Sequence, residues 1–197
     1  MEKPDLISRY EYLKSLVVSR KTEFERLMAF VEGSTAYLTA PASTHYHLCC
    51  EQGLLEHSVN VAETMLKIKK VLAPEISDES CVIVALLHDL GKAGTPGDPL
   101  YLKNPAANGY RSSFSGHGSP YPYLYNKEHT YLSVPVRSLF LILGFFPLSE
   151  TECQAICYHD GQYVDDNRSV ATHETPLTLL LQYADNWSGF VIEERSA

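Results

Sequence analysis

Apolar side chains spaced three and four residues apart constrain this chain most, because they predict amphipathic helices in several separate segments. Residues 6–31 have this spacing and should form helix, with a break near Ser19. Residues 53–72 form a second strong helical segment, which Pro74 ends. The stripe expected to be buried in this segment consists of Leu54, Leu55, Val59, Ala62, Met65, Leu66 and Val71. No set of strands emerges, so the predicted fold class is all-α.

The middle of the chain combines a short apolar helix with a long irregular segment. Asp78 is a suitable N-cap for a helix over residues 81–90, and Gly91 should end that helix as a C′ glycine. Residues 94–126 are rich in Gly, Pro, Ser, Asn and Tyr and have little periodicity. We expect a long irregular loop there, of a length that usually serves as a lid or a binding loop.

Three further helical segments are predicted in the last third of the chain. The first covers residues 127–143, where Pro135 should start a new turn or a kink. The second covers residues 149–158, because Ser149 and Glu152 have the spacing of a capping box. After a loop at 161–174, the third follows Pro176, a residue suited to a first helical turn, and covers residues 177–193.

Length and charge limit what the chain can be. Its 197 residues suit one domain, which we expect to span residues 1–197. The formal net charge of −8 argues against a broad basic surface for duplex DNA or anionic lipid. The longest strongly apolar run, residues 139–146, is too short to cross a membrane. The first ten residues are polar and the five cysteines are an odd number, so we expect a cytoplasmic protein.

Four polar side chains stand in or beside apolar helical runs, and they are the strongest sign of chemistry. They are His57, His88, Asp89 and Asp185. An ionised carboxylate in an apolar interior is costly unless it is paired or binds a metal. Two carboxylates near two imidazoles would form a suitable ligand set for a divalent cation.

These residues also carry a family resemblance. The string Leu86-Leu87-His88-Asp89-Leu90-Gly91-Lys92 resembles the central motif of the HD superfamily of metal-dependent phosphohydrolases. Gly53-Leu54-Leu55-Glu56-His57-Ser58 resembles its first-histidine segment, and Tyr183-Ala184-Asp185 resembles its closing aspartate. The resemblance implies an HD-domain helical bundle over about residues 41–192, preceded by N-terminal helices at 5–32. It further implies that His57, His88, Asp89 and Asp185 are metal ligands.

Two more histidines favour two metal ions over one. His129 and His159 lie in the interval where two-metal members of the superfamily carry extra histidines. The resemblance implies that both are ligands and that Asp89 bridges the two ions, which would be Mn, Fe, Ni, Zn or Mg. The alternative is that His129 and His159 only contact substrate phosphate or cap helix ends.

A narrower resemblance points to one subgroup. Pro41-Ala42-Ser43, followed by His45 and His47, is similar to the subgroup of bacterial 3′-to-5′ exoribonucleases and HD-type relaxases. Tyr158-His159-Asp160-Gly161 is similar to the His-His-Gly of that subgroup, except that Asp160 replaces the second histidine. The exoribonucleases also carry an extra nucleic-acid-binding domain, for which this chain has no room.

The expected reaction is hydrolysis of a phosphoester in a nucleotide or short oligonucleotide by a metal-activated water. Asp89 would hold that water and could accept its proton, and Lys92 would contact phosphate, unless it is a solvated surface lysine. Weaker candidates for substrate contact are His45, His47, Lys127 and Arg111.

Three other functions remain open at this point. They are 3′-to-5′ exonuclease action on single-stranded nucleic acid, a metal- or nucleotide-sensing module without turnover, and a di-iron oxygenase. The expected partner is a small phosphorylated substrate or a short single strand, without a membrane. The apolar run at 139–146 could be core or the surface of a homo-oligomer.

Overall fold

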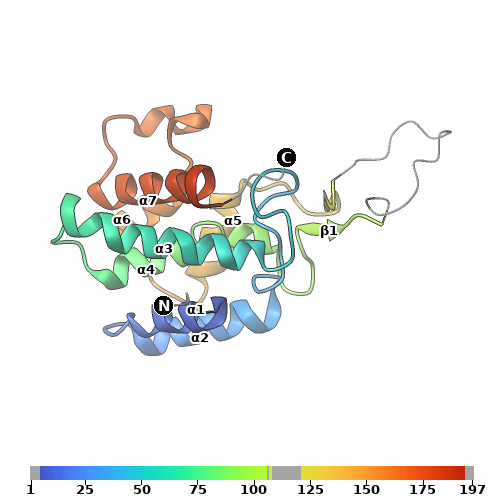
Figure 1. The fold of residues 1–197 in the computed structure, drawn as a ribbon, viewed down its shortest axis with the longest axis horizontal. Coiled ribbons are helices and arrows are strands. Elements are labelled where there is room, and N and C mark those ends of the chain that lie inside the picture. The colour runs from blue at the N-terminus through green and yellow to red at the C-terminus, as the bar shows by residue number, and fades with distance from the viewer. Residues whose placement is uncertain (1–4, 106, 108–120, 194–197) are drawn as a thin grey trace.

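A computed structural model describes residues 5–105, 107 and 121–193 of the chain. The all-α prediction is confirmed, because helices surround one hydrophobic core (Figure 1). The helices are α1 (Leu6–Ser15), α2 (Lys21–Ser34), α3 (Gly53–Leu72), α4 (Asp78–Leu87), α5 (Val134–Leu143), α6 (Glu150–Cys157) and α7 (Pro176–Trp187). The predicted break near Ser19 is confirmed by the gap between α1 and α2. None of the described helices is both long and apolar enough to cross a lipid bilayer.

Helix α3 lies at the centre and packs against both α4 and α7, while α1 and α2 cover the side away from α7 (Figure 1). Most of its predicted stripe is buried, including Leu54, Val59 and Met65. Val71 is an exception, since 83% of its surface is exposed. Nine residues at 3.6 per turn place Val71 about half a turn away from Ala62, on the face opposite the core.

The start of α4 differs from the prediction. The helix begins at Asp78, and Ser77 is its N-cap, with a side chain that accepts a hydrogen bond from the Ser80 backbone N–H. Asp78 therefore lies in the first turn, where its carboxylate pairs with Lys69 at 2.6 Å. Both residues can cap a helix, but Ser77 comes first and has the extended backbone that an N-cap requires.

The predicted role of Gly91 as a C′ glycine is wrong. Helix α4 ends at Leu87, and Gly91 lies inside a 3-10 helix, η1 (Leu90–Ala93). A Cβ atom on Gly91 would stand 2.3 Å from the carbonyl oxygen of Val134, and the Gly91 N–H donates to Ser138 Oγ at 2.8 Å. Glycine is needed here because the turn after Asp89 presses against the backbone of α5.

Two short strands lie in the segment predicted to be irregular. Strand β1 (Tyr101–Lys103) pairs antiparallel with β2 (Tyr123–Tyr125), and the rings of Tyr101 and Tyr125 lie 5.3 Å apart. Three-residue strands are too short for alternation to reveal them, so sequence periodicity missed both.

Helix α5 starts at Val134, so the helix predicted for residues 127–133 is wrong. Pro135 lies in the first turn of α5, because a proline further inside would clash with the preceding turn.

The last third of the chain follows the prediction with two corrections. Helix α6 has the predicted capping box between Ser149 and Glu152. The loop after it contains two 3-10 helices, η2 (Gly161–Tyr163) and η3 (Asp165–Val170). The predicted final helix is divided, since α7 ends at Trp187 and a π-helix, η4 (Ser188–Ile192), follows. This wider turn brings the chain back towards α3.

Candidate metal centre

Five polar side chains from four helices and their ends meet in the interior. His57 comes from the start of α3, His88 and Asp89 from the end of α4, His159 from the end of α6 and Asp185 from the last turns of α7. His57, His88, Asp89 and His159 are each at most 2% exposed. Packing of α3 against α4 and α7 therefore assembles the four residues that the central resemblance assigned to a metal, together with His159.

The carboxylate of Asp89 is at the middle of this group. Its Oδ2 lies 3.6 Å from His57 Nε2 and 3.4 Å from His88 Nε2. Its Oδ1 lies 3.5 Å from His159 Nε2, and on the outer side His57 Nε2 lies 3.1 Å from Asp185 Oδ1. The two oxygens of Asp89 thus face different histidines, an arrangement suited to a bridging carboxylate.

Backbone carbonyls orient two of the imidazoles. His88 Nδ1 donates to the Ala85 carbonyl at 2.8 Å, and His159 Nδ1 donates to the Ile156 carbonyl at 2.9 Å. Each carbonyl belongs to the last turn of a helix, where it has no helical N–H partner. A carbonyl can only accept, so each Nδ1 carries the proton. In the neutral rings, Nε2 then presents a lone pair to Asp89.

The group leaves buried polar atoms without hydrogen bonds, and this is the observation that fits a metal. His88 Nε2 and Asp89 Oδ1 are both buried without a hydrogen-bond partner. Separations of 3.4–3.6 Å exceed those of good N–H···O bonds. Two ligand atoms about 2.1 Å from a shared ion would lie roughly 3.0–3.4 Å apart. Potential ligand atoms of His57, His88 and Asp89 all lie within 4.8 Å of one another, as do those of His88, His159 and Asp185.

The carboxylates of the centre are ionised. Burial alone would raise the pKa of Asp89, but the nearby charges of Lys92 and His88 hold it well below its ordinary value. Burial likewise opposes ionisation of Asp185, but a hydrogen bond and attraction from His57 lower the pKa of that carboxyl. A divalent cation would therefore meet carboxylates in the protonation state that metal binding requires.

Two histidines are held protonated when no metal is bound. Burial lowers the pKa of His57, but its hydrogen bonds with Asp185 and Glu193 outweigh this and raise it to about 10. Burial also opposes protonation of His159, while the carboxylates of Asp89, at 3.5 Å, and Asp160 attract its charge and raise its pKa to about 9. Metal binding must therefore displace protons from both rings.

Beside these ligands is a cavity of about 350 Å³. Lys92 lies on its wall and donates from Nζ to Asp89 Oδ2 at 2.6 Å, so it is a cation of the site rather than a solvated surface lysine. The sequence did not indicate Tyr46, Tyr163 or Phe190 as site residues, because exposed aromatic side chains in loops and helix ends carry no sequence signal. The lining residues are Tyr46, His47, His57, Asp89, Lys92, His159, Asp160, Tyr163, Asp185, Asn186, Gly189 and Phe190.

Not all predicted substrate contacts reach this cavity. His47 lines it, whereas His45 is not a lining residue and packs, at 4.0 Å between ring centroids, against Tyr46, which is one. Lys127 is exposed and is not among the lining residues. Arg111 lies outside the described residues.

The structure does not bring His129 into the metal group. Its Nε2 lies 2.9 Å from the carbonyl oxygen of Asp98 and 3.3 Å from Asp98 Oδ2, in the turn before α5. Among the described residues, the potential metal-binding groups include His159 but not His129. This geometry therefore does not support the ligand role predicted for His129. It does support the ligand role predicted for His159.

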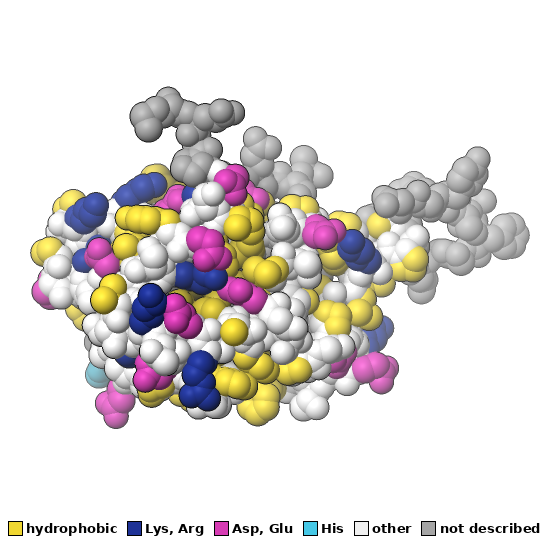
Figure 2. Space-filling model, turned by 90° about the horizontal axis from the view of Figure 1, so that it is seen from below, with side chains coloured by type: hydrophobic (Ala, Val, Ile, Leu, Met, Phe, Trp, Pro, Cys, Tyr) yellow, Lys and Arg dark blue, Asp and Glu magenta, His cyan; other side chains and the backbone are white. Residues whose placement is uncertain are grey.

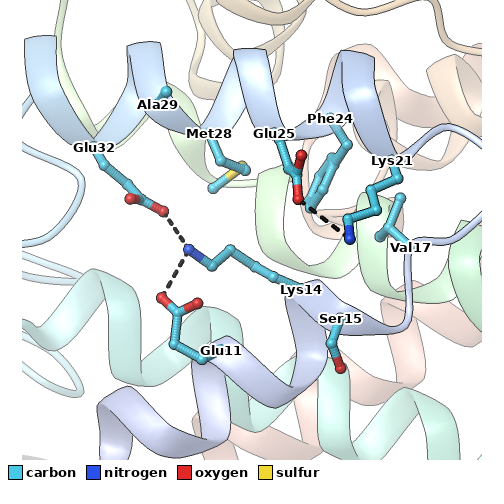
Figure 3. A pocket seen from close by; sticks show the side chains of 10 residues that line it. All are labelled: Glu11, Lys14, Ser15, Val17, Lys21, Phe24, Glu25, Met28, Ala29 and Glu32. Atoms are coloured by element: carbon cyan, nitrogen blue, oxygen red, sulfur yellow. Dashed lines mark hydrogen bonds and ion pairs between the residues drawn. The ribbon is translucent and has the colours of Figure 1, made fainter.

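A second cavity, of about 310 Å³, lies between α1 and α2 but lacks such chemistry. In Figure 3, Lys14 reaches between Glu11 and Glu32, at 2.8 Å from each carboxylate, and Lys21 faces Glu25 at 3.7 Å. The face that α1 and α2 form has acidic and basic side chains beside one another (Figure 2). Its charges compensate each other, and none of its lining residues belongs to a potential metal-binding group of the described residues.

Comparison with known proteins agrees with this geometry. A family model of the HD domain matches residues 54–188, well over half of the chain, and the protein belongs to the HD domain family. Proteins of this family are generally metal-dependent hydrolases, and the buried group at Asp89 could hold such an ion. No curated protein and no solved structure matches the chain significantly.

Proposed function

We propose that this protein is a phosphohydrolase that uses divalent metal to cleave a phosphoester of a nucleotide or short oligonucleotide. The single observation that carries the proposal is that the two oxygens of Asp89 face different histidines. His57, His88 and Asp185 would hold one ion, and His159 a second ion on the other oxygen of Asp89. When bound, the ions would supply a hydroxide at neutral pH and neutralise charge on phosphoryl oxygens.

The protein groups around Asp89 fit the remaining tasks of a hydrolase. Lys92 places an ammonium at the cavity wall, where it can bind a non-bridging phosphate oxygen. Asp89 would orient the attacking water, and it would accept the proton of that water where the ions leave one carboxylate oxygen free. Burial of the ligands excludes bulk water and strengthens each of these electrostatic interactions.

The outer part of the cavity favours a substrate with a flat ring. Tyr46, Tyr163 and Phe190 line it and are each more than half exposed. Exposed aromatic faces can stack on a nucleobase, with a contribution of about 1–3 kcal/mol per base. This combination of a phosphate-binding floor and an aromatic rim is the basis for proposing nucleotides.

Metal analysis followed by a substrate panel tests the proposal. We expect the purified protein to bind two Mn²⁺ ions per chain, Asp89→Ala none, and His159→Ala a single ion. His129→Ala, as a matched control outside the group, should still bind two. Nucleotides, cyclic dinucleotides and short oligonucleotides are then incubated with the Mn²⁺ form. The absence of metal binding in the wild type would overturn the proposal, and binding without turnover of any substrate would indicate a sensing module.

A further inference from the structure

A buried carboxylate that no sequence pattern indicated lies on the far side of His57. Glu193 follows the π-helix η4, and its side chain is only 1% exposed. Its two oxygens accept hydrogen bonds from His57 Nδ1, at 3.1 and 3.0 Å. This is the ring nitrogen that points away from Asp89 and Asp185, whose oxygens face Nε2.

We propose that Glu193 is the positioning residue of the metal centre. Its carboxylate fixes the proton of His57 on Nδ1 and aims the Nε2 lone pair at the ion that Asp89 and Asp185 would share. A carboxylate on the second nitrogen of a metal-binding histidine also makes the ring a stronger ligand. The inference rests on the metal centre proposed above. It adds a residue outside the matched HD region, which ends at 188.

Glu193 is itself held by a chain of buried hydrogen bonds. Asn60 Nδ2 donates to Glu193 Oε1 at 3.1 Å, and Asn60 Oδ1 accepts from Arg9 Nη2 at 2.8 Å. Arg9 in turn binds both oxygens of Glu63, at 2.7 and 2.9 Å. One side of the carboxylate is therefore anchored to α1 and α3, and this anchoring fixes its position beside His57.

The π-helix η4 makes this reach possible. The Glu193 N–H donates to the Ser188 carbonyl at 3.0 Å, which closes the wide turn. Within that turn, a Cβ on Gly189 would lie 3.4 Å from the imidazole of His47. His47 therefore packs directly on the turn, and its Nε2 lies 3.5 Å from Glu193 Oε2. The segment from Ser188 to Glu193 thus closes over the first histidine.

This arrangement couples metal binding to the packing of residues 188–193 against His57, which is called docking below. If docked Glu193 improves His57 as a ligand, then bound metal must stabilise the docked segment by the same factor, because linkage is reciprocal. A purely structural glutamate would stabilise the fold without responding to metal.

Metal affinity of Glu193 variants tests the proposal. Mn²⁺ binding to the full chain is measured by calorimetry for wild type, Glu193→Gln and Glu193→Ala. We expect affinity to fall roughly 10–100-fold in Glu193→Ala and less in Glu193→Gln, whose amide oxygen still accepts from Nδ1. The control is Glu32→Gln, which removes a carboxylate from Lys14 and Tyr10, away from the centre, and should leave the affinity unchanged.

Two further readouts separate positioning from a structural role. Co²⁺ bound to Glu193→Gln should show a shifted visible absorption band, because the ligand field of His57 changes. Mn²⁺ should slow amide hydrogen exchange of residues 188–193 in the wild type and not in Glu193→Ala. If Glu193→Ala does not fold, Glu193→Gln carries the test alone.

The possible failures are distinct. Wild-type affinity and an unshifted Co²⁺ band in Glu193→Gln would overturn the positioning role and leave the proposed function intact. A wild type that binds no metal would overturn the proposed function, and the inference with it.

Discussion

Two charge clusters in this molecule, one partly buried and one more deeply buried, differ in how their polar atoms are paired. One surrounds Arg20, which donates to Glu79 at 2.8 Å and to both oxygens of Glu152 at 2.6 and 2.9 Å. The second oxygen of Glu79 accepts from the backbone N–H groups of Val18 and Ser19. The other cluster is the metal centre, where His88 Nε2 and Asp89 Oδ1 have no hydrogen-bond partner.

The difference separates a structural cluster from a functional one. Around Arg20 each buried oxygen has a donor, as expected where burial of charge must not reduce stability. At Asp89, the Nε2 atoms of His57 and His159 lie 3.6 and 3.5 Å from the carboxylate oxygens, which is too long for good hydrogen bonds but suited to a shared ion. Without a metal, His88 Nε2 and Asp89 Oδ1 therefore stay unpaired, and a shared cation would satisfy both atoms.

The largest expected effect comes from Asp89→Asn. On the proposed function, loss of this carboxylate would remove a ligand from both ions, so Mn²⁺ affinity should fall at least about 1,000-fold and hydrolysis should be abolished. Calorimetry and phosphate release measure the two losses. The Arg20 cluster is untouched by this change, so a near-ultraviolet circular dichroism spectrum unlike that of the wild type would show that the fold itself was disturbed.

The complementary variant is Arg20→Met. It leaves the carboxylate of Glu152, which is 1% exposed, without its cation, and should lower the free energy of unfolding by about 3 kcal/mol. Mn²⁺ affinity should stay within twofold of the wild type. Urea unfolding provides the measurement, and Lys21→Met is the control, because its pair with Glu25 is exposed. A large loss of metal affinity in Arg20→Met would mean that the two clusters are not independent.

The contributions of the two clusters to the free energy of unfolding should also change with pH in opposite directions. His57 has a pKa raised to about 10, so its contribution to the stability of the metal-free protein is full below the unfolded value of 6.5 and is lost as pH rises towards 10. The pKa of Glu79 and that of Glu152 are lowered because Arg20 outweighs the effect of burial, so their contribution is lost only as pH falls through those values.

The protonation of the histidines in the metal centre can be measured through the pH dependence of metal binding. Each histidine proton displaced should raise Mn²⁺ affinity about tenfold per pH unit, so the two from His57 and His159 together should raise it about 100-fold per pH unit between pH 6 and 8. Calorimetry at three pH values gives the slope. A flat profile would show that His57 and His159 bind no proton that the metal displaces.

The metal centre also shows which site residues could be predicted from the sequence and which could not. His57, His88, Asp89 and Asp185 were recognisable because each interrupts or adjoins an apolar helical run, where a polar residue is conspicuous. Glu193 was not, since it begins a polar run, Glu193-Glu194-Arg195-Ser196, at the end of a predicted helix. It becomes buried only because η4 is a π-helix, and single-turn π-helices have no periodicity that a sequence reveals.

The same limit applied to the elements of the fold. Helices with caps and long apolar stripes, such as α3 and α6, were predicted well. Strands β1 and β2 were missed because three residues are too few to show alternation, and the role of Gly91 was misread because the reason for glycine there is the backbone of α5. Both depend on contacts between segments distant in sequence.

Lys92→Met should have the smallest effect and is the most informative about how Asp89 is used. The ammonium now lies 2.6 Å from Asp89 Oδ2, so it competes with metal for that oxygen as well as offering a contact to phosphate. Its removal should lower kcat/KM roughly tenfold, the loss of one charge-assisted hydrogen bond, while Mn²⁺ affinity stays level or rises. Steady-state kinetics and calorimetry on the same preparation separate the two quantities. A parallel fall in metal affinity would instead show that Lys92 holds the Asp89 carboxylate in position. Lys92 would then have a structural role like that of Arg20 and no direct role in binding substrate.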